Sequence, residues 1–184
     1  MIYSKAEKTI VTERLRLRLF NESDAKDVSL LCNNYNIYKS TLSLPYPYPI
    51  ECALSWIANH EQNFEMGRMY EFAITDKRSG QLYGAIAISN HSHYQNGELA
   101  YWIGEEYWGN GYATEAAKAM LEFVFEEQDY HRVYARHFIS NPGSGRIMEK
   151  CGMTCEGTLK DHIVKDGSFE DIVYYGIINP RHEK

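Results

Sequence analysis

The stretch from Tyr107 to Ala116 limits most strongly what this chain can fold into. It has the sequence Tyr-Trp-Gly-Asn-Gly-Tyr-Ala-Thr-Glu-Ala, and it joins a strand predicted for Glu98–Ile103 to an amphipathic helix predicted for Tyr112–Phe125. Such a succession favours a layered domain of sheet and helices. The loop also presents successive main-chain N–H groups at a helix N-terminus, which is where proteins bind phosphate oxygens. Taken alone, the two glycines are equally well explained by a plain tight turn.

The remaining patterns predict a mixed sheet. Alternating or apolar runs predict strands, and capping residues such as Asn141 before Pro142 predict helices. We therefore expect one domain over residues 1–184, an α/β (α+β) fold with a single mixed, mostly antiparallel sheet of about seven strands flanked by about four helices. Besides those above, the expected strands are Glu13–Leu19, Met69–Thr75, Gln81–Ser89, Arg132–Ile139, Thr154–Leu159 and Glu170–Ile178, and the expected helices follow Asn21–Asp24, run from Ile50 to about Phe64, and run from Pro142 to Cys151–Gly152.

Two loops have distinctive chemistry. Leu44–Pro49 alternates proline with tyrosine, which excludes helix and central strand, so we expect an exposed, stiff loop whose tyrosines shape an acceptor pocket. Asp166–Gly167 is a typical hairpin turn between the last two strands.

Composition excludes several classes of protein. A net charge of −6 argues against binding to nucleic acid, which requires a basic face. No apolar run approaches the roughly 20 residues that a membrane span needs. The polar segment Met1–Lys8 does not resemble a signal peptide, so we expect a cytoplasmic protein with free thiols. The spacing of Cys151, Cys155 and His162 does not fit a usual zinc site, and we expect no metal. A homodimer is compatible with the sequence, which does not fix the oligomeric state.

The glycine loop does not match the usual nucleotide motifs. A P-loop ends in Gly-Lys-Ser/Thr, which is absent here. A Rossmann fingerprint needs a carboxylate at the end of the next strand, which here ends Arg136-His137-Phe138. A coenzyme A diphosphate needs the main-chain N–H groups but not that acid.

A second motif follows the next strand: Asn141-Pro142-Gly143-Ser144-Gly145-Arg146-Ile147-Met148-Glu149-Lys150-Cys151-Gly152. Together with the Trp-Gly-x-Gly-Tyr-Ala-Thr-Glu-Ala run, it resembles the GCN5-related N-acetyltransferase (GNAT) superfamily. The run Thr12–Arg18 and the proline–tyrosine loop ahead of a helix with Trp56 are similar to the RimJ/RimL-like branch, which acetylates ribosomal-protein N-termini. The resemblance covers about Val11 to Ile178. It implies the acyl-CoA N-acyltransferase fold and acetyl-CoA as co-substrate.

The resemblance also assigns roles to individual residues. The main-chain N–H groups from Trp108 to Thr114 would hold the diphosphate. Main-chain N–H groups near Trp102 and Ile103, where the strand splays from its neighbour, would hold the pantetheine arm and polarise the thioester carbonyl. Asn141 would bind the same arm; it is also explained as a helix cap, and it could serve both purposes. The residues expected to bind the cofactor are Trp102, Ile103, Trp108, Gly109, Asn110, Gly111, Tyr112, Ala113, Thr114, Asn141 and Ser144.

The sequence departs from the superfamily pattern at the position of the general acid. Many members have a tyrosine where this chain has Met148, so Ser144 is our candidate for protonating the leaving thiolate. Glu98 is the candidate general base, because it lies at the start of the strand whose far end should meet the thioester. Ile163 occupies the position of a carboxylate used by some members, with Asp161 and His162 beside it as reserve candidates. Two further residues, His91 and His93, are candidates for lining the acceptor site.

These residues predict direct transfer of an acetyl group to an amine, with the oxyanion on a main-chain N–H group and no metal. No cysteine lies in the phosphate loop, which argues against a covalent acyl-enzyme. The expected acceptor is a protein N-terminal α-amine. The alternatives are a small amine of the polyamine or aminoglycoside type, a non-catalytic CoA-binding sensor, and a nucleotide-binding module.

Overall fold

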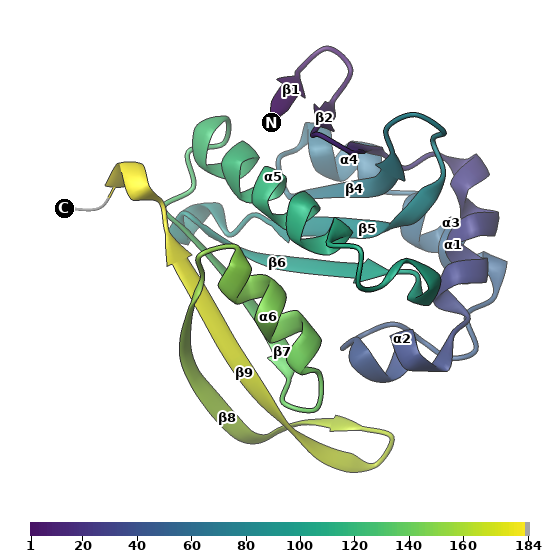
Figure 1. The fold of residues 1–184 in the computed structure, drawn as a ribbon, viewed down its shortest axis with the longest axis vertical. Helices are drawn as coiled ribbons and strands as arrows, with labels where there is room; N and C mark the ends of the chain where they lie inside the picture. The colour runs from purple at the N-terminus through teal and green to yellow at the C-terminus, as the bar shows by residue number, and fades with distance from the viewer. Residues whose placement is uncertain (183–184) are drawn as a thin grey trace.

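One nine-stranded sheet organises the chain (Figure 1). The computed structural model describes residues 1–182. All neighbouring strands are antiparallel except β6 and β7, which are parallel. In the sheet order β1-β2-β3-β4-β5-β6-β7-β9-β8, the strands are β1 Ile2–Ser4, β2 Thr9–Val11, β3 Leu15–Leu19, β4 Met69–Asp76, β5 Leu82–Ser89, β6 Asn96–Ile103, β7 Arg132–Phe138, β9 Ser168–Ile178 and β8 Thr154–Lys165.

Helices cover both faces of the sheet (Figure 1). Helices α5 and α6 pack on one face and enclose the larger apolar core, while α1 and α3 enclose the smaller one on the other. The helices are α1 Ala25–Cys32, α2 Tyr35–Ser40, α3 Ile50–Ile57, α4 His60–Glu65, α5 Tyr112–Glu126 and α6 Pro142–Lys150, and the 3₁₀ turns are Glu22–Asp24, Ser92–Tyr94, Glu105–Tyr107 and Pro180–His182.

Helix α5 fixes the centre of the fold. Its buried side follows the helical period, and small residues such as Ala113, Ala116 and Ala117 let its first turns lie close to the strands. Gly111, at the N-cap, has a φ of +81°, a left-handed conformation that glycine adopts without the penalty of a Cβ atom. The predicted helix over residues 112–125 is confirmed, with one residue added at its end.

The sheet opens between β6 and β7. These two strands pair only over Asn96–Glu98 and Arg132–Tyr134. Beyond that point β6 continues along β5 as far as Ile103, while β7 continues along β9 as far as Phe138. The expected splay is therefore present, and it leaves main-chain groups of β6 without a strand partner on that side.

The structure corrects the number of elements. Residues 1–182 form nine strands rather than about seven, because the polar N-terminal segment forms the short hairpin β1–β2 on the sheet edge. The structure has six α-helices rather than about four within the described residues. The helix expected from Ile50 to Phe64 is broken at Asn59, whose φ of −107° and ψ of 0° separate α3 from α4, and α2 was not expected.

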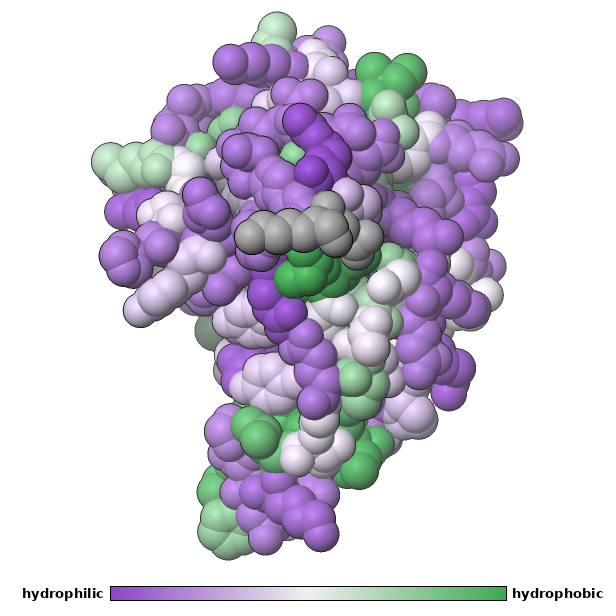
Figure 2. All heavy atoms as spheres, turned by 90° about the vertical axis from the view of Figure 1, so that its left-hand side faces the viewer, coloured by the Kyte–Doolittle hydropathy of each residue, from purple (hydrophilic) through white to green (hydrophobic). Residues whose placement is uncertain are grey.

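The last two strands are longer than predicted. The Asp166–Gly167 turn is confirmed, with both residues at positive φ, and pairing of β8 with β9 extends up to it. This hairpin projects from the sheet, and its side chains Leu159, Val164 and Phe169 are exposed. Figure 2 shows the molecule from the left-hand side of Figure 1, where hydrophilic residues predominate and several hydrophobic ones lie toward the lower end.

Candidate functional site

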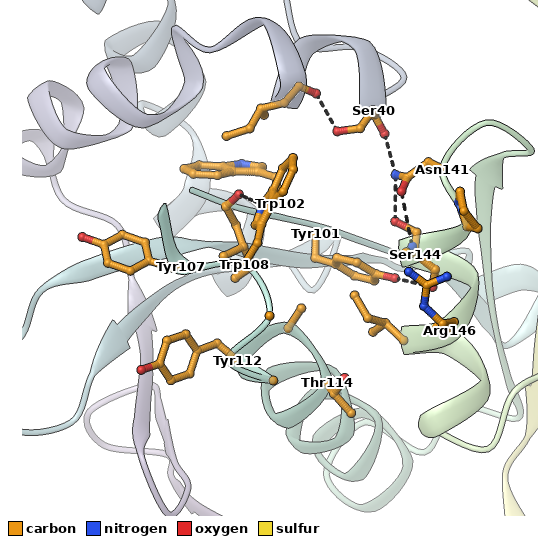
Figure 3. Close-up of a pocket in the computed structure, with 18 of the residues that line it drawn as sticks. Ser40, Tyr101, Trp102, Tyr107, Trp108, Tyr112, Thr114, Asn141, Ser144 and Arg146 are labelled. Atoms are coloured by element: carbon orange, nitrogen blue, oxygen red, sulfur yellow. Dashed lines mark hydrogen bonds between the residues drawn. The ribbon is translucent and has the colours of Figure 1, made fainter. Parts of the chain in front are cut away.

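A cavity of about 520 Å³ lies where β6, the start of α5 and the start of α6 converge (Figure 3). The glycine loop forms one wall, α6 forms another, and α2 with the residues after it closes the cavity. The lining includes every residue expected to bind the cofactor except Asn110, and it adds Ile37, Ser40, Thr41, Tyr101, Tyr107, Pro142, Gly143, Arg146, Ile147 and Lys150.

The loop wall consists mainly of main-chain groups. Among residues 1–182, no protein group accepts a hydrogen bond from the main-chain N–H groups of Gly109 through Thr114, and the first helical bond of the loop runs from Glu115 N to Gly111 O. Gly109 has a φ of +78°, and a Cβ atom there would meet nothing within 4 Å. Free donors at the N-terminus of a long helix, with open space before them, suit the diphosphate of coenzyme A.

Trp108 plays a different part from its neighbours. Its main-chain N–H donates to Glu105 O at 3.1 Å, and its indole Nε1 donates to Ile103 O at 2.7 Å. The main-chain donor predicted at this position is therefore already used inside the protein. The side chain, still 46% exposed, ties the loop to the end of β6.

Arg14 braces the loop from the neighbouring strand region, a contact that sequence analysis missed. Its Nη1 donates to Asn110 O at 3.0 Å, its Nε bonds Glu115 at 2.7 Å, and its guanidinium lies 4.9 Å from the centre of the Tyr112 ring. Hydrogen bonds from Thr12 and Arg14 lower the pKa of Glu115 although burial opposes them. Arg14 therefore connects the loop at Asn110 with the first turn of α5 at Glu115.

Ser144 and Tyr101 meet at the centre of the site (Figure 3). The Tyr101 hydroxyl donates to Ser144 O at 3.1 Å, and burial raises the pKa of Tyr101, so this phenol keeps its proton at neutral pH. The Ser144 hydroxyl accepts a hydrogen bond from Asn141 Nδ2 at 3.1 Å. The motif comparison drew attention to Ser144 but missed Tyr101, whose only sequence signal is its place near the end of β6.

Both ends of the Asn141 side-chain amide make hydrogen bonds within the protein. Its Oδ1 accepts from Ser144 N at the start of α6, which confirms the helix cap. Its Nδ2 also donates to Ser40 O at 3.2 Å, which ties α6 to the end of α2 across the cavity (Figure 3). Asn141 lines the cavity, and its direct bond to a pantetheine arm stays a prediction.

The main-chain directions on β6 refine the expected oxyanion site. Gly104 N donates to Tyr83 O on β5 at 2.8 Å. Because N–H groups alternate along a strand, that of Trp102 also points to β5, while those of Tyr101 and Ile103 point to the open side. Of the two expected donors, the main-chain N–H group of Ile103 faces the splay and that of Trp102 does not. The N–H group of Tyr101, which was not expected, faces the splay as well.

A second cavity of about 390 Å³ adjoins the first on the face of the sheet covered by α1 and α3. Glu98 lines it, and the Glu98 carboxylate bonds Arg136 Nε at 2.7 Å and lies 3.4 Å from the Tyr134 hydroxyl. The two cavities share Ser40, Thr41, Tyr101, Trp102 and Ser144. An acceptor in the second cavity would therefore reach the cofactor cavity at the splay.

Several predicted contributors lie elsewhere. Pro45–Pro49 lines neither cavity. The preceding residues, Ser40–Leu44, line the second cavity in its place. Tyr48 is buried, whereas an exposed loop was expected. Tyr48 faces the smaller core because its main chain is bonded to Asn33 and Ser29 of the α1 region.

The histidine and reserve-acid candidates are also outside the two cavities. His91 and His93 lie in the exposed turn before β6, and Asp161 and His162 lie on the exposed strand β8. None of the four lines either cavity.

No group of three or more His, Cys, Asp or Glu side chains within residues 1–182 is arranged to hold a metal ion. All four cysteines are free, and burial raises the pKa of Cys151 to about 11 and that of Cys32 to about 12. Across the described helices, none combines the length and apolar character that crossing a bilayer requires.

Comparison with known proteins identifies the family and the fold. The model of the acetyltransferase (GNAT) domain matches residues 14–154. The [ribosomal protein uS5]-alanine N-acetyltransferase of Escherichia coli is 27% identical over 93% of this chain and 91% of its own. The uncharacterised N-acetyltransferase YnaD of Bacillus subtilis is 30% identical over 92% of this chain and 96% of its own. The solved structure of RimL, the ribosomal L7/L12 α-N-protein acetyltransferase with coenzyme A, superposes with a TM-score of 0.85 at 19% identity, covering 92% of this chain and 97% of RimL.

Proposed function

The chain belongs to the GNAT acetyltransferase family and is an acetyl-CoA-dependent N-acetyltransferase; we propose that its acceptor is the α-amine at the N-terminus of a protein. The observation that supports transfer to an acceptor is that the two cavities meet at the opened end of β6 and share residues there. The kinship with the uS5-alanine N-acetyltransferase favours an N-terminal acceptor. An α-amine, with a pKa near 8, is also partly neutral at physiological pH, whereas a lysine amine is almost wholly protonated. The free thiols accord with a cytoplasmic setting.

The residues of the first cavity suit the cofactor. The N–H groups from Gly109 to Thr114 would bind its diphosphate, and those of Tyr101 and Ile103 would bind the arm and the carbonyl oxygen. When bound, acetyl-CoA supplies an acetyl thioester, whose carbon–sulfur bond breaks as the amine forms the new carbon–nitrogen bond.

Glu98 and Ser144 remain our candidates for moving protons. Glu98 would accept the proton that the attacking nitrogen loses, directly or through a water molecule. Its carboxylate can accept up to about four hydrogen bonds, so the Arg136 contact leaves room for one from the substrate side. Ser144 would donate a proton to the leaving sulfur, and Tyr101 is the second hydroxyl at the same junction.

An acceptor assay tests the function directly. Purified protein is incubated with acetyl-CoA and either short peptides with free N-termini, the same peptides with blocked N-termini, or free amines, and thiol release is measured. The proposal expects release with free N-terminal peptides and none with blocked ones. Turnover with small amines alone would contradict the N-terminal acceptor and indicate a small-molecule acetyltransferase. Binding of acetyl-CoA without turnover on any amine would indicate a CoA-binding sensor.

A further inference from the structure

The second cavity, called the acceptor cavity from here on, is lined by another carboxylate besides that of Glu98. This is Glu71, on the side away from the splay. Glu71 lies on β4 and is only 6% exposed. Asn63 Nδ2 donates to its Oε2 at 2.9 Å, and His60 Nε2 lies 3.1 Å from its Oε1 without the alignment of a hydrogen bond. The side chain is therefore held in place at the cavity wall, while Oε1 receives no hydrogen bond from residues 1–182.

The floor between Glu71 and the reaction centre is open. Glu71 is opposite Ala87 of β5, and Ala87 is opposite Ala100 of β6. Both alanines line the cavity, Ala87 is half-buried and Ala100 is exposed. Two strand spacings separate Glu71 from the main chain of β6, which is roughly 10 Å. A ligand can therefore lie across the sheet from Ala100, which precedes Tyr101, to Glu71, over a floor formed by the side chains of Ala87 and Ala100.

The charges of the cavity are unbalanced. Its lining contains two carboxylates, Glu71 and Glu98, and one guanidinium, that of Arg136, which pairs with Glu98. No lysine or arginine in the described part of the chain lies within ion-pair distance of Glu71. A carboxylate this deeply buried is stabilised by a positive partner, and His60 provides one only when it is protonated.

We propose that Glu71 binds a second positive charge on the acceptor, so that the enzyme prefers amines with another cationic group within about 10 Å of the nitrogen that is acetylated. The inference rests on the proposed transfer to an amine in this cavity. In a peptide the second charge is a lysine or arginine side chain near the N-terminus. In a small molecule it is the far end of a diamine.

The first test uses the wild-type protein and matched probes. Ala-Lys peptides are compared with the same peptides carrying Nε-acetyl-lysine, and diaminobutane and diaminohexane are compared with pentylamine and heptylamine. We expect kcat/KM to be at least tenfold higher for the probe with the second charge, in the peptide pair or in the diamine pairs. Equal values in all pairs would overturn this inference alone, and no acetylation of any probe would overturn it together with the proposed function.

The second test removes the charge. Glu71→Gln keeps the size of the side chain and an oxygen for Asn63. In this variant the kcat/KM values for the doubly charged probe and for its matched control should differ by less than twofold. Glu126→Gln, an exposed position at the end of α5, makes the same change of charge outside the cavity and should leave the preference intact. An undiminished preference in folded Glu71→Gln, with acetyl-CoA uptake as the check on folding, would overturn the assignment.

A third variant, Ala87→Leu, tests the proposal even if Glu71→Gln does not fold. Ala87→Leu places a larger side chain on the cavity floor, between Glu71 and β6, and leaves both carboxylates in the chain. It should also abolish the preference for the second charge. Retention of the preference in this variant would contradict the path across the sheet.

Discussion

The cofactor cavity and the acceptor cavity meet at the same junction, yet they use different parts of the chain. The first presents main-chain N–H groups of one continuous loop, from Gly109 to Thr114. The second presents side chains from separate strands, among them Glu71 of β4, Glu98 of β6 and Arg136 of β7. A main-chain site tolerates side-chain changes that keep the backbone, whereas a side-chain site can change its ligand through one substitution.

The largest effect is expected in the acceptor cavity. Glu98→Gln removes the candidate base and should lower kcat by at least about 100-fold, within the range usual for general acid–base catalysis. Steady-state kinetics over a range of pH with a good acceptor measure it, and Glu126→Gln is the matched control. A kcat close to that of the wild type would assign the proton to another group.

In the cofactor cavity, a change that disturbs the main chain should have the next largest effect. Gly111→Glu forces a residue with a side chain into a φ of +81° and adds a negative charge beside the free N–H groups. Affinity for acetyl-CoA should fall at least tenfold, or about 1.4 kcal/mol, in calorimetric titration.

Gly80→Glu is the control for that experiment. Gly80 has a φ of +77° in the β4–β5 turn, and a Cβ atom there would meet nothing within 4 Å, so the substitution imposes a similar backbone strain and charge away from both cavities. If both variants bind acetyl-CoA equally well, the loop does not hold the diphosphate.

The junction residues should give a smaller effect. Ser144→Ala removes one hydroxyl and should lower kcat roughly fivefold, the equivalent of one hydrogen bond of about 1 kcal/mol, with little change in acetyl-CoA affinity. Tyr101→Phe, measured in parallel, tells which hydroxyl serves the leaving sulfur. A wild-type kcat in Ser144→Ala combined with a reduced kcat in Tyr101→Phe would transfer the role to Tyr101.

The smallest effect is expected from a side chain within the main-chain site. Thr114→Val keeps the shape and the main-chain N–H group of Thr114 and removes only its hydroxyl. Acetyl-CoA affinity should change less than threefold, about 0.7 kcal/mol. A loss of tenfold or more in the same titration would show that side chains, and not the main chain alone, bind the diphosphate.

The same difference explains what could be predicted from sequence. The glycine loop, α5, the Asn141 cap and the Asp166–Gly167 turn depend on local conformational preferences, and the structure confirms them as elements. The helix breaks at Asn59, and His60, the next residue, lies 3.1 Å from Glu71, a contact between distant segments that local patterns do not report. Glu71 itself lies within an apolar strand run, with no local signal that marks it.

Edge elements were also beyond local prediction. Three-residue strands such as β1 and β2 carry too few alternating residues to be distinguished from a polar terminus. The burial of Tyr48 depends on contacts with Asn33 and Ser29, from another segment of the chain.

The central claim concerns main-chain N–H groups, and amide NMR observes them individually. In a titration of ¹⁵N-labelled protein with acetyl-CoA, we expect saturable shifts that are largest at the six residues from Gly109 to Thr114, with smaller ones at Tyr101 and Ile103. Saturable binding that leaves the resonances of Gly109 to Thr114 unchanged would contradict the account.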